Sequence, residues 1–448
     1  MKVYIDTLGC MKNFNDSEMA LGMLEERGHE TVSSPEDADV IIVNTCGFIE
    51  DAKKESISEI FAMAEFKKDG KKLIVSGCLA QRYAEELFEE IPEADGFVGV
   101  NDYARLPELL NRLEENGGER FREADPDRTG DLERESKKRR LPENPYSASI
   151  RIAEGCDNRC SYCVIPEIRG GYRSRTKESL VREAERLAEA GCKELIVIAQ
   201  DTSCYGTDLY GKCELPDLLR RFCAIDGIRW IRLMYCYEEN IGSELIETIK
   251  TEEKICRYID IPLQHFSDKV LTAMNRGSTQ ESILRTLERL RREIPGIRVR
   301  TTLMVGFPGE TEEDFEELID FVREQEFDRL GAFAYSREEG TLAAEMEDQI
   351  PEEVKAERLD AVMYTQMEIS NKLNTHMTGE VLDVLIDEID RDGSYIGRTE
   401  FDAPEIDNSV IFSSPVKHAP GEIVKVKILD AFDYDLEGRE VFENEFTE

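Results

Sequence analysis

The stretch Cys156-Asp157-Asn158-Arg159-Cys160-Ser161-Tyr162-Cys163 brings three thiols together within eight residues. It closely follows residues 149–153, which predict a strand, and the polar residues between the thiols predict a loop. Three cysteine ligands leave one iron of a 4Fe–4S cluster free to bind another molecule, whereas a fourth ligand would close the site. The spacing therefore predicts an open iron–sulfur cluster at the end of a strand.

A structural zinc ion is the alternative for these three thiols. Such a site normally takes four cysteine or histidine ligands, and the histidine closest in sequence, His265, lies about a hundred residues later. Thiols that pack as ordinary core side chains are a second alternative, which the polar loop residues disfavour. The iron–sulfur interpretation fits the pattern better than either.

Three further cysteines, Cys10, Cys46 and Cys78, are spaced one strand-and-helix unit apart. They follow strands predicted at residues 3–8, 40–44 and 72–76. Apolar strands that alternate with helices indicate a parallel sheet covered on both faces. Because the carboxyl ends of parallel strands lie side by side, we expect the three thiols to converge at one edge of the sheet. The pattern predicts a second iron–sulfur cluster, again with one iron left open.

The alternative for Cys10, Cys46 and Cys78 is that they are small buried apolar side chains, as free cysteines often are. Each of them, however, stands beside a glycine at the equivalent place after a strand, which favours a shared role. The remaining cysteines show no common pattern and receive no role: Cys192, Cys204, Cys213, Cys223, Cys236 and Cys256. Among these, Cys204 is the best candidate for a function, since it lies just after the strand predicted at 195–199.

The composition is that of a folded cytoplasmic protein. The chain has 448 residues, 40% of them hydrophobic, which is enough for about three domains with their own cores. No apolar stretch approaches the ~18 residues of a membrane-spanning helix, and the N-terminal residues lack the apolar core of a signal peptide. Twelve cysteines without a secretory signal indicate reduced thiols rather than a disulfide framework. We therefore expect a cytoplasmic location and no membrane partner.

The charge is strongly negative, with a formal net charge of −39. Such a chain repels phosphate backbones at long range unless a local basic patch offsets the field. We therefore do not expect stable nucleic-acid binding, and a protein or small-molecule substrate is favoured. The alternative is that the acidity only keeps the chain soluble.

Changes of pattern divide the chain into four segments. Residues 1–115 alternate strand and helix, and the pattern then dissolves over residues 116–145, which predict a linker. A second alternating series occupies residues 146–376, and residues 377–448 switch to short β-type runs. The linker carries the basic run Lys137-Lys138-Arg139-Arg140. In so acidic a chain we expect this run to be solvated rather than to touch nucleic acid.

The series over residues 146–376 predicts an open or partial (β/α)6 barrel, in which chemistry gathers at the carboxyl ends of the strands. Its strands are predicted at 149–153, 195–199, 230–234, 258–261, 298–305 and 330–335. Helices are predicted between them, for example at 180–190, 282–292 and 311–324. Thr311 and Asp314 form a capping pattern at the start of the last of these. A further helix is predicted over residues 351–371.

The last segment predicts a small all-β barrel or sandwich. Its strands are predicted at 381–386, 395–399, 409–412 and 423–429, with Asp392-Gly393 as a hairpin-type turn. Residues 378–448 contain 6 Lys or Arg and 19 Asp or Glu, a net charge of −13. This module is therefore acidic in its own right. The fold class predicted for the whole chain is α/β, with an all-β module at the C-terminal end.

The triplet has an aromatic residue before its last cysteine and follows the first strand of a β/α barrel, and in both respects it resembles the radical S-adenosylmethionine (SAM) superfamily. The resemblance implies that this cluster binds the amino and carboxylate groups of SAM and cleaves its sulfonium to a 5′-deoxyadenosyl radical. It also implies SAM contacts from Tyr162, Gln200, Gly306 and Phe307. Gln200 closes the second barrel strand, and Gly306 and Phe307 form a turn after the fifth. Ordinary turn and loop residues are the alternative for these positions.

Over its whole length the sequence resembles the methylthiotransferases, which are radical SAM enzymes with an N-terminal cluster domain, a central barrel and a C-terminal TRAM module. The matching motifs besides the triplet are Thr7-Leu8-Gly9-Cys10-Met11-Lys12-Asn13, Asn44-Thr45-Cys46-Gly47-Phe48-Ile49, Ser76-Gly77-Cys78-Leu79-Ala80-Gln81-Arg82, and Ile168-Arg169-Gly170 leading to Arg173-Ser174-Arg175. The resemblance implies two 4Fe–4S clusters and two uses of SAM. One SAM methylates sulfur carried at the cluster of the dispersed cysteines, and the other gives the radical that removes hydrogen from an unactivated carbon.

Two branches of this family differ in substrate. One modifies an adenosine beside the tRNA anticodon, and the other modifies the β-carbon of an aspartate in small-subunit ribosomal protein twelve. Three motifs resemble the second branch: Asp16-Ser17-Glu18, Phe48-Ile49-Glu50-Asp51-Ala52 and Ala199-Gln200-Asp201-Thr202-Ser203-Cys204-Tyr205-Gly206. The acidic final module agrees, because it would attract a basic ribosomal protein and repel tRNA. Met11 departs from the pattern, where this branch more often has proline.

We therefore expect a methylthiotransferase that acts on ribosomal protein twelve, with an electron donor such as a flavodoxin and a sulfur source as further partners. A radical is required because an aspartate β-C–H is far too weak an acid for a side-chain base. The alternative within the family is a tRNA adenosine methylthiotransferase, and the alternative of another class is an iron–sulfur electron-transfer protein. No catalytic side chain is assigned from the sequence.

Overall fold

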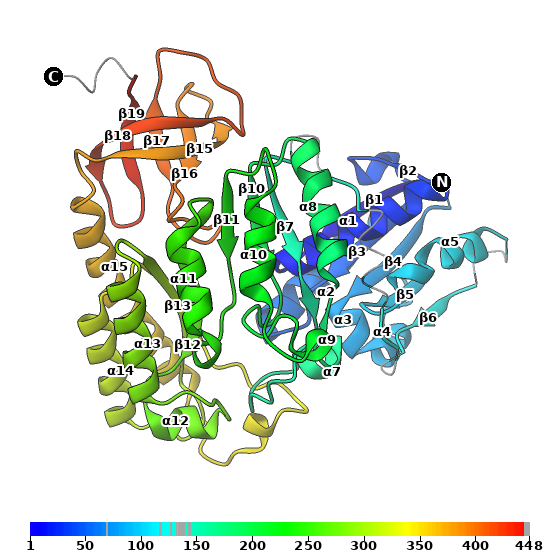
Figure 1. Ribbon diagram of the computed structural model, residues 1–448. Helices are drawn as coiled ribbons and strands as arrows, with labels where there is room; N and C mark the ends of the chain where they lie inside the picture. The colour runs from blue at the N-terminus through cyan, green and yellow to red at the C-terminus, as the bar shows by residue number, and fades with distance from the viewer. Residues whose placement is uncertain are drawn as a thin grey trace. The chain divides into compact units, whose positions relative to one another are not determined.

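The computed structural model describes residues 1–68, 70–115, 119–125, 128–130, 132, 139–141 and 145–442 (Figure 1). The chain folds as two compact units, each built from three separate stretches. The first unit contains Met1–Pro142, Ser149–Glu183 and Ser336–Ala344, and the second contains Glu143–Ala148, Ala184–Tyr335 and Glu345–Glu448. Among the described residues, no helix is both long enough and apolar enough to cross a membrane.

The first unit is built on a six-stranded parallel sheet with the strand order β2-β1-β3-β4-β5-β6. The strands are β1 (Lys2–Thr7), β2 (Glu30–Thr31), β3 (Val40–Thr45), β4 (Lys72–Gly77), β5 (Gly96–Gly99) and β6 (Phe121–Glu123). The helices are α1 (Met11–Glu26), η1 (Pro35–Asp37), α2 (Glu50–Ala64), α3 (Cys78–Arg82), α4 (Ala84–Glu90), η2 (Tyr103–Arg105) and α5 (Leu106–Glu115). The α/β fold predicted for this region is confirmed.

Both faces of this sheet are apolar because its strands are apolar without interruption. In β3, Val40 and Ile42 belong to the core shared with α1 and α5, whereas Ile41 and Val43 belong to the core shared with α2, α3 and α4. All four side chains are buried. Helices therefore cover the sheet on both sides, as continuous apolar strands require.

The first unit also contains the segment with the cysteine triplet. It holds the end of β7 (Ser147–Arg151), then β8 (Ala153–Glu154), α7 (Ile165–Arg169), β9 (Arg173–Ser174) and the first part of α8 (Lys177–Glu189). β8 and β9 pair antiparallel, so that the chain leaves and re-enters this two-stranded sheet around the triplet. The short 3-10 helix η5 (Leu342–Glu345) begins in the last stretch of this unit, Ser336–Ala344.

The second unit is built on an open sheet with the strand order β14-β13-β12-β11-β10-β7. The strands after β7 are β10 (Glu194–Ile198), β11 (Trp230–Leu233), β12 (Ile255–Gln264), β13 (Arg298–Val305) and β14 (Arg329–Ala334), and their neighbouring pairs are parallel. The helices are α9 (Thr207–Tyr210), α10 (Leu215–Cys223), η4 (Glu238–Asn240), α11 (Ser243–Thr251), α12 (Asp268–Ala273), α13 (Gln280–Glu293), α14 (Glu312–Gln325) and α15 (Glu352–Thr375). All six strands predicted for the partial barrel are present.

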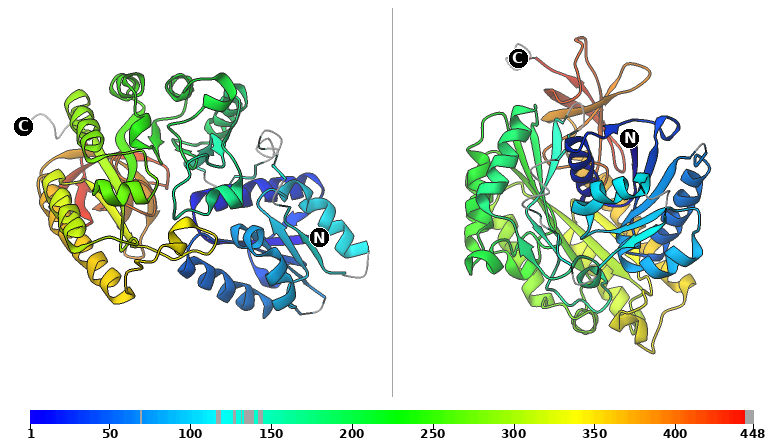
Figure 2. Two further views of the ribbon diagram at one scale, coloured as in Figure 1. Left: turned by 90° about the horizontal axis from the view of Figure 1, so that it is seen from below. Right: turned by 90° about the vertical axis from the view of Figure 1, so that its right-hand side faces the viewer.

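The C-terminal part of the second unit is a closed five-stranded barrel with the order β15-β16-β17-β19-β18. Its strands are β15 (Val381–Ile389), β16 (Tyr395–Arg398), β17 (Val410–Ser413), β18 (Ile423–Ala431) and β19 (Leu436–Glu440). Alternate residues fill its core, such as Val424, Val426 and Ile428 on β18. The prediction of a small all-β barrel is confirmed, and Figure 2 shows this barrel at the end of α15.

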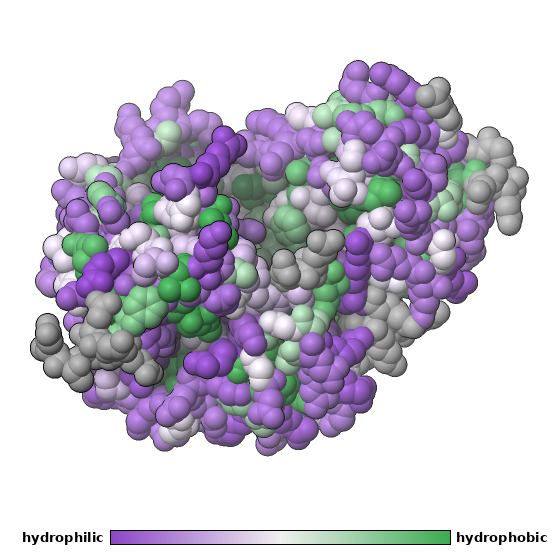
Figure 3. All heavy atoms as spheres, turned by 90° about the horizontal axis from the view of Figure 1, so that it is seen from above, coloured by the Kyte–Doolittle hydropathy of each residue, from purple (hydrophilic) through white to green (hydrophobic). Residues whose placement is uncertain are grey.

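Buried ion pairs join the C-terminal barrel to the parallel sheet of the same unit. Glu194 on β10 is completely buried, and its carboxylate accepts from Arg232 Nε at 2.8 Å and lies 2.7 Å from Arg398 Nη2 on β16. Arg329 on β14 likewise binds Asp402, at 2.6 Å. Burial alone would raise the pKa of Glu194, but the two arginines lower it to about 2. The face drawn in Figure 3 is mostly hydrophilic, with hydrophobic residues scattered over it.

The structure adds elements that the sequence patterns did not predict. Helix α1 begins at Met11, directly after Cys10, and α3 begins at Cys78 itself. Strands β5, β6 and β19 are short and carry Gly, Arg or Glu, so their patterns are weak. Part of the predicted linker, including Lys137 and Lys138, lies outside the described residues.

One expectation for that linker is wrong. Arg139 was expected in a solvated charge run, but its side chain is only 3% exposed. It lies between two carboxylates, with Nε 2.7 Å from Glu18 and Nη1 3.1 Å from Glu183. A single sequence window cannot show that these carboxylates approach from distant segments, which is why the charge run was misread.

Candidate cofactor-binding site

Three of the predicted ligands, Cys10, Cys46 and Cys78, follow three neighbouring strands of the first unit. Cys10 is the N-cap of α1 after β1, Cys46 follows β3, and Cys78 is the first residue of α3 after β4. The strands are in register, with Thr7 opposite Asn44 and Thr45 opposite Gly77. The three cysteines therefore leave the sheet at the same edge.

The loops that carry these cysteines approach one another closely. Gly9 has φ +89°, and a Cβ at this position would lie 2.8 Å from Cys46 Cβ and 3.2 Å from Cys46 Sγ. Only glycine permits both this backbone conformation and this approach. Burial raises the pKa of Cys78 to about 12; Arg169 opposes the rise, and the neighbouring Cys10 and Cys46 add to it. The thiols are thus near enough to interact electrostatically.

Asn13, in the first turn of α1, ties these loops together. Its Nδ2 donates to the carbonyl oxygens of Leu8, at 2.8 Å, and Thr45, at 3.1 Å. Its Oδ1 accepts from the Cys78 thiol, with a sulfur-to-oxygen distance of 3.7 Å. A fully buried amide therefore holds all three cysteine loops in one arrangement.

The triplet loop is closed by contacts between its two ends. Gly155 has φ +76°, and a Cβ there would lie 2.1 Å from the carbonyl oxygen of Gly171. The amide of Cys156 donates to the carbonyl oxygen of Gly170 at 3.1 Å, and the amide of Cys163 donates to that of Cys160 at 3.1 Å. Cys156 and Cys160 are buried, and Cys163 is half-buried. The loop is thus a compact turn around the three thiols.

A buried arginine from the helix after the triplet reaches the other set of cysteines. Arg169, at the end of α7, is 2% exposed, and its Nη2 donates to Cys78 Sγ at 3.4 Å. The same nitrogen lies 3.0 Å from Asn13 Oδ1 and 3.0 Å from Asp16 Oδ2. Its Nη1 binds both oxygens of Glu154, at 3.3 and 3.2 Å. The two predicted ligand sets are therefore linked through one side chain within the first unit.

The stretch Ser336–Ala344 also contacts both ligand regions. Glu338 is 2% exposed and accepts from Arg82 Nη1 at 2.7 Å and Lys53 Nζ at 2.9 Å. Arg82, four residues after Cys78, also donates to the carbonyl oxygen of Gly47, beside Cys46, at 3.1 Å. At the other end of the stretch, the amide of Ala343 donates to the carbonyl oxygen of Ser161, inside the triplet, at 2.8 Å.

The sequence patterns missed several residues of this site. Asn13, Arg82 and Arg169 stood in the motifs but received no role, and Glu338 gave no signal. Glu338 and Arg82 are 256 positions apart, so no local pattern could have paired them. The place of Arg169 between Ile168 and Gly170, inside a matching motif, was the one available signal.

The donor set of each predicted site is three thiols, which is the set that an open iron–sulfur cluster takes. Among the described residues, no three His, Cys, Asp or Glu side chains gather as the ligands of one metal ion. Ligands of a 4Fe–4S cluster bind different irons, so their sulfurs stand farther apart than the ligands around a single ion. Two sets of three thiols without a fourth protein ligand therefore fit open clusters better than zinc sites.

The residues expected to bind SAM lie in both units. Tyr162 is half-buried in the triplet loop of the first unit. In the second unit, Gln200 follows β10, and Gly306 and Phe307 follow β13. The amides of Gly306 and Phe307 both donate to Glu310 Oε2, at 2.8 and 3.3 Å, which fixes the turn.

The side chains around this turn are packed. The Phe307 ring is fully buried and packs edge-on against Tyr335, with the ring centres 5.5 Å apart. A Cβ at Gly306 would lie 2.3 Å from Lys355 Cγ, so the lysine stem crosses over the glycine. Lys355 Nζ donates to the carbonyl oxygen of Tyr335 at 3.0 Å. In this structure Phe307 supports the turn from inside the core.

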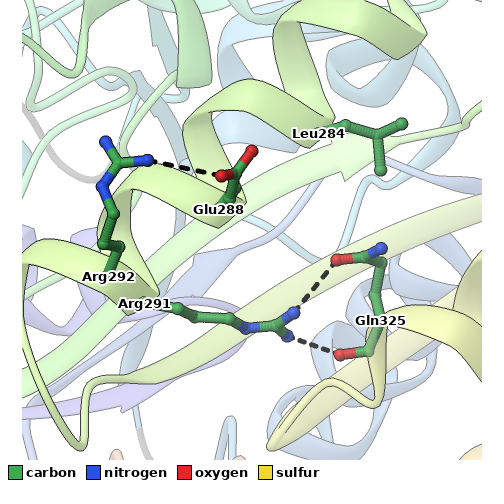
Figure 4. A pocket seen from close by; sticks show the side chains of 5 residues that line it. All are labelled: Leu284, Glu288, Arg291, Arg292 and Gln325. Atoms are coloured by element: carbon green, nitrogen blue, oxygen red, sulfur yellow. Dashed lines mark hydrogen bonds and ion pairs between the residues drawn. The ribbon is translucent and has the colours of Figure 1, made fainter.

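A groove on the second unit lies apart from these residues. It is lined by Leu284, Glu288, Arg291, Arg292 and Gln325, from α13 and α14 (Figure 4). Its arginines are already engaged: Arg291 Nη1 donates to Gln325 Oε1 at 3.0 Å, and Arg292 pairs with Glu288 at 3.3 Å. None of the predicted ligands lines this groove.

Curated proteins are similar to this chain over almost its full length. It is 49% identical over 448 residues to the ribosomal protein uS12 methylthiotransferase RimO of Clostridioides difficile, with 99% of each chain covered. It is also 49% identical over 444 residues to the RimO of Lachnoclostridium phytofermentans, with 98% of this chain and 99% of that protein covered. The chain belongs to the uS12 methylthiotransferase family.

Three family models match successive parts of this uS12 methylthiotransferase family member. Residues 2–99 match the uncharacterised protein family UPF0004, 150–322 match the Radical SAM superfamily, and 378–441 match the TRAM domain. Cys10, Cys46 and Cys78 fall in the first match and the triplet in the second. The C-terminal five-stranded barrel is therefore the TRAM domain of this methylthiotransferase.

Solved structures share the fold of this methylthiotransferase family member. The radical SAM methyltransferase TsrM of Kitasatospora setae, with tryptophan and a SAM analogue bound, aligns with a TM-score of 0.55 at 15% identity, covering 84% of this chain and 90% of that one. A second TsrM structure, with cobalamin and a 4Fe–4S cluster bound, gives a TM-score of 0.53 at 16% identity and covers 85% and 80% of the two chains. At this identity the likeness concerns the fold only.

Proposed function

We propose that the chain transfers a methylthio group to the β-carbon of an aspartate in small-subunit ribosomal protein uS12. The observation that carries this is the match over essentially the full length to proteins named for that activity. The radical SAM match and the two sets of three thiols supply the chemistry that such a reaction requires. The protein is therefore assigned as an enzyme that transfers a sulfur-containing group.

In this proposal Cys10, Cys46 and Cys78 hold one 4Fe–4S cluster, and Cys156, Cys160 and Cys163 hold the second. When bound, the clusters and SAM supply the electron, the carbon radical and the sulfur and methyl groups that are transferred. The chain itself fixes the ligands: Asn13 joins the first three loops, and Gly155 lets the triplet loop close. Burial of Cys78, Cys156 and Cys160 would keep water away from their sulfurs once these bind iron.

The proposed contacts for SAM are Tyr162, Gln200, Gly306 and Phe307. Support comes from their places after the strands β10 and β13 and within the triplet loop, and from the turn that Glu310 fixes. Gly306 has a positive φ of +72°, a backbone conformation that glycine adopts readily and that lets the chain turn directly after β13. Domain boundaries are proposed after residues 115, 145 and 376.

The proposed macromolecular partner is a basic ribosomal protein. The chain carries a net charge of −39, and its last 71 residues, 378–448, are acidic as well. Such a surface attracts a basic protein and repels a phosphate backbone. An electron donor such as a flavodoxin and a source of sulfur complete the reaction, which we place in the cytoplasm.

The test is a reaction under oxygen-free conditions. The full chain, loaded with iron and sulfide, is incubated with SAM, a reductant, sulfide and purified uS12. We expect release of 5′-deoxyadenosine and a mass gain on one aspartate equal to a methylthio group replacing a hydrogen. Cys156→Ala is expected to abolish 5′-deoxyadenosine release, whereas Cys223→Ala, a cysteine outside both sets, retains it. Equal release from Cys156→Ala would contradict the proposal.

The same material separates the alternatives. A tRNA methylthiotransferase would bind anticodon stem-loops with an affinity that falls steeply with salt, and would leave the mass of uS12 unchanged. An electron carrier would show cluster spectra that do not respond to SAM. We expect a SAM-dependent change in the spectrum of the reduced protein and no binding of the stem-loop.

A further inference from the structure

The guanidinium of Arg169 lies in the wall of the first cysteine site, and the chemistry described so far gives it no task. It comes from the segment that carries the other cysteine set, six residues after Cys163. It nevertheless contacts Cys78, which is 91 positions away in the sequence. An arginine this deeply buried needs partners for its charge, and one of these partners is a proposed cluster ligand.

The position of the guanidinium is fixed from two sides. Nη1 is held by both oxygens of Glu154, at 3.3 and 3.2 Å, and Nη2 is held by Asp16 Oδ2 at 3.0 Å. Because the guanidinium is planar, these contacts leave it little freedom to rotate. Nη2 also donates to Asn13 Oδ1 at 3.0 Å, and in this position it lies 3.4 Å from Cys78 Sγ.

The two carboxylates that hold Arg169 are shared with a second arginine. Arg151 also binds both carboxylates, with Nη1 2.6 Å from Asp16 Oδ1 and 2.5 Å from Glu154 Oε2. Two arginines therefore face two carboxylates in a buried group that is neutral overall. If Cys78 bound iron, it would release its proton to solvent and its sulfur would be a thiolate, for which Arg169 would be a charge-assisted donor already in place.

We propose that Arg169 is a positioning residue for the first iron–sulfur cluster and donates a hydrogen bond to the iron-bound sulfur of Cys78. The proposal rests on the proposed function, because it takes Cys78 as a cluster ligand. A positive donor at a ligand sulfur stabilises the reduced, more negative form of a cluster and so raises its midpoint potential. Arg169 also couples this cluster to α7, the helix that follows the triplet.

The first experiment detects the contact directly. The full chain with Cys156→Ala, Cys160→Ala and Cys163→Ala is loaded with iron and sulfide, so that only the first cluster forms, and its arginine side chains are labelled with nitrogen-15. Pulsed electron paramagnetic resonance of the reduced cluster should show a coupling to a labelled nitrogen. Arg169→Lys should remove this coupling. Arg139→Lys, at a buried arginine of the same unit that binds Glu18 and Glu183, should leave it.

The second experiment measures the midpoint potential of the same cluster. Arg169→Gln removes the positive donor and should shift the potential to a more negative value, with Arg169→Lys between it and the parent. Arg139→Gln removes a buried charge without touching the cluster ligands and should leave the potential unchanged. If Arg169→Gln fails to fold, the lysine variant still decides, since it keeps the charge needed by Asp16 and Glu154.

The outcomes distinguish the two proposals. Absence of iron from the triplet variant would remove the first cluster from the proposed function, and the role of Arg169 with it. A cluster that binds but shows no arginine coupling, or one whose coupling survives Arg169→Lys, overturns the role of Arg169 alone. A potential that moves equally in the Arg169→Gln and Arg139→Gln variants also overturns it, because the effect would then be a general consequence of losing a buried charge.

Discussion

At the residue scale, Gly155 and Gly170 have the same backbone angle φ but lie in different surroundings. Both have φ +76°, but a Cβ at Gly155 would lie 2.1 Å from a carbonyl oxygen, whereas nothing lies within 4 Å of one at Gly170. Gly170→Ala is expected to cost about 1 kcal/mol, from the torsion alone. Gly155→Ala should cost about 1–3 kcal/mol more, because the triplet loop must open.

Denaturant unfolding of the two variants measures this difference, and iron content after loading reports the state of the loop. Gly155→Ala should bind less iron than Gly170→Ala. Equal stability and equal iron content in the two variants would mean that the close contact at Gly155 does not hold the loop shut.

Glu194 is a second residue whose surroundings determine how much it contributes to stability. Burial would raise its pKa, but Arg398 and Arg232 hold it at about 2 in the folded chain, below the ordinary value of 4.5. Its contribution to stability is therefore fully present above about pH 4.5 and is lost as the pH falls towards 2. Glu194→Gln should cost about 3–5 kcal/mol at neutral pH, because two buried arginines lose their counter-charge.

Denaturant midpoints from pH 3 to pH 7 check this expectation. The loss on Glu194→Gln should shrink as the pH is lowered towards 3, since Glu194 of the unfolded parent, with its ordinary pKa of 4.5, is then protonated while the folded carboxylate stays ionised. Glu247→Gln is the control, because Glu247 forms an exposed pair with Lys250 and should change stability by less than about 0.5 kcal/mol. A loss for Glu194→Gln that is the same at all pH values would contradict the ionised state.

At the element scale, the start of α14 rests on a reciprocal cap. Thr311 Oγ1 accepts from the amide of Asp314, and Asp314 Oδ2 accepts from the amide of Thr311 at 2.9 Å. Thr311→Ala removes the first bond and should cost about 1 kcal/mol. Thr251→Ala is the control: Thr251 Oγ1 donates to Glu247 at the end of α11 and caps no N-terminus, so its loss should be smaller.

Chemical denaturation of both threonine variants tests the cap. Asp314 is desolvated, but Lys269, Ser267 and Thr311 more than offset this and lower its pKa. The stability that this carboxylate provides is present above its ordinary pKa of 3.8 and is lost as the pH falls below that value. The cost of Thr311→Ala should therefore be seen at neutral pH, and equal losses in the two variants would argue against the cap.

Elements with strong local patterns could be predicted from the sequence. The capping pattern at Thr311, the six strands of the open sheet and the continuous apolar strand β3 all appeared as expected. β19, with the sequence Leu-Glu-Gly-Arg-Glu, could not be predicted, because the barrel rather than its own composition makes it a strand. The α3 helix was missed because it is only five residues long, too short to show a helical pattern.

Some features of the candidate site could likewise be predicted from the sequence, and others could not. The convergence of Cys10, Cys46 and Cys78 could be anticipated, because the order of parallel strands and their carboxyl ends follow from general topology. The contacts of Arg169 and Glu338 could not be anticipated, because each joins segments far apart in the chain. Local patterns thus indicate where chemistry gathers, but the buried charges that support it are visible only in three dimensions.

At the scale of the whole molecule, the net charge of −39 acts on every folded part. Mutual repulsion of like charges destabilises a compact state, and salt screens it with a Debye length of about 10 Å at 0.1 M. The melting temperature should therefore rise as sodium chloride is increased from about 0.02 to 0.2 M. Calorimetry at pH 7.5 measures this, and tetramethylammonium chloride as a second salt controls for specific sodium binding. A melting temperature that falls over this range would mean that attractive pairs dominate.

The first unit is built from three separate stretches of the chain, and this limits which fragments of the protein can be expressed alone. This unit draws on Met1–Pro142, Ser149–Glu183 and Ser336–Ala344, so the limits of the family matches are not places where the protein can be cut. A fragment that stops at residue 142 keeps Asp16 but loses Arg151 and Arg169, its two cationic partners. Expressed alone, such a truncated N-terminal piece should be poorly soluble or unfolded, and work on either cluster should begin from the intact polypeptide.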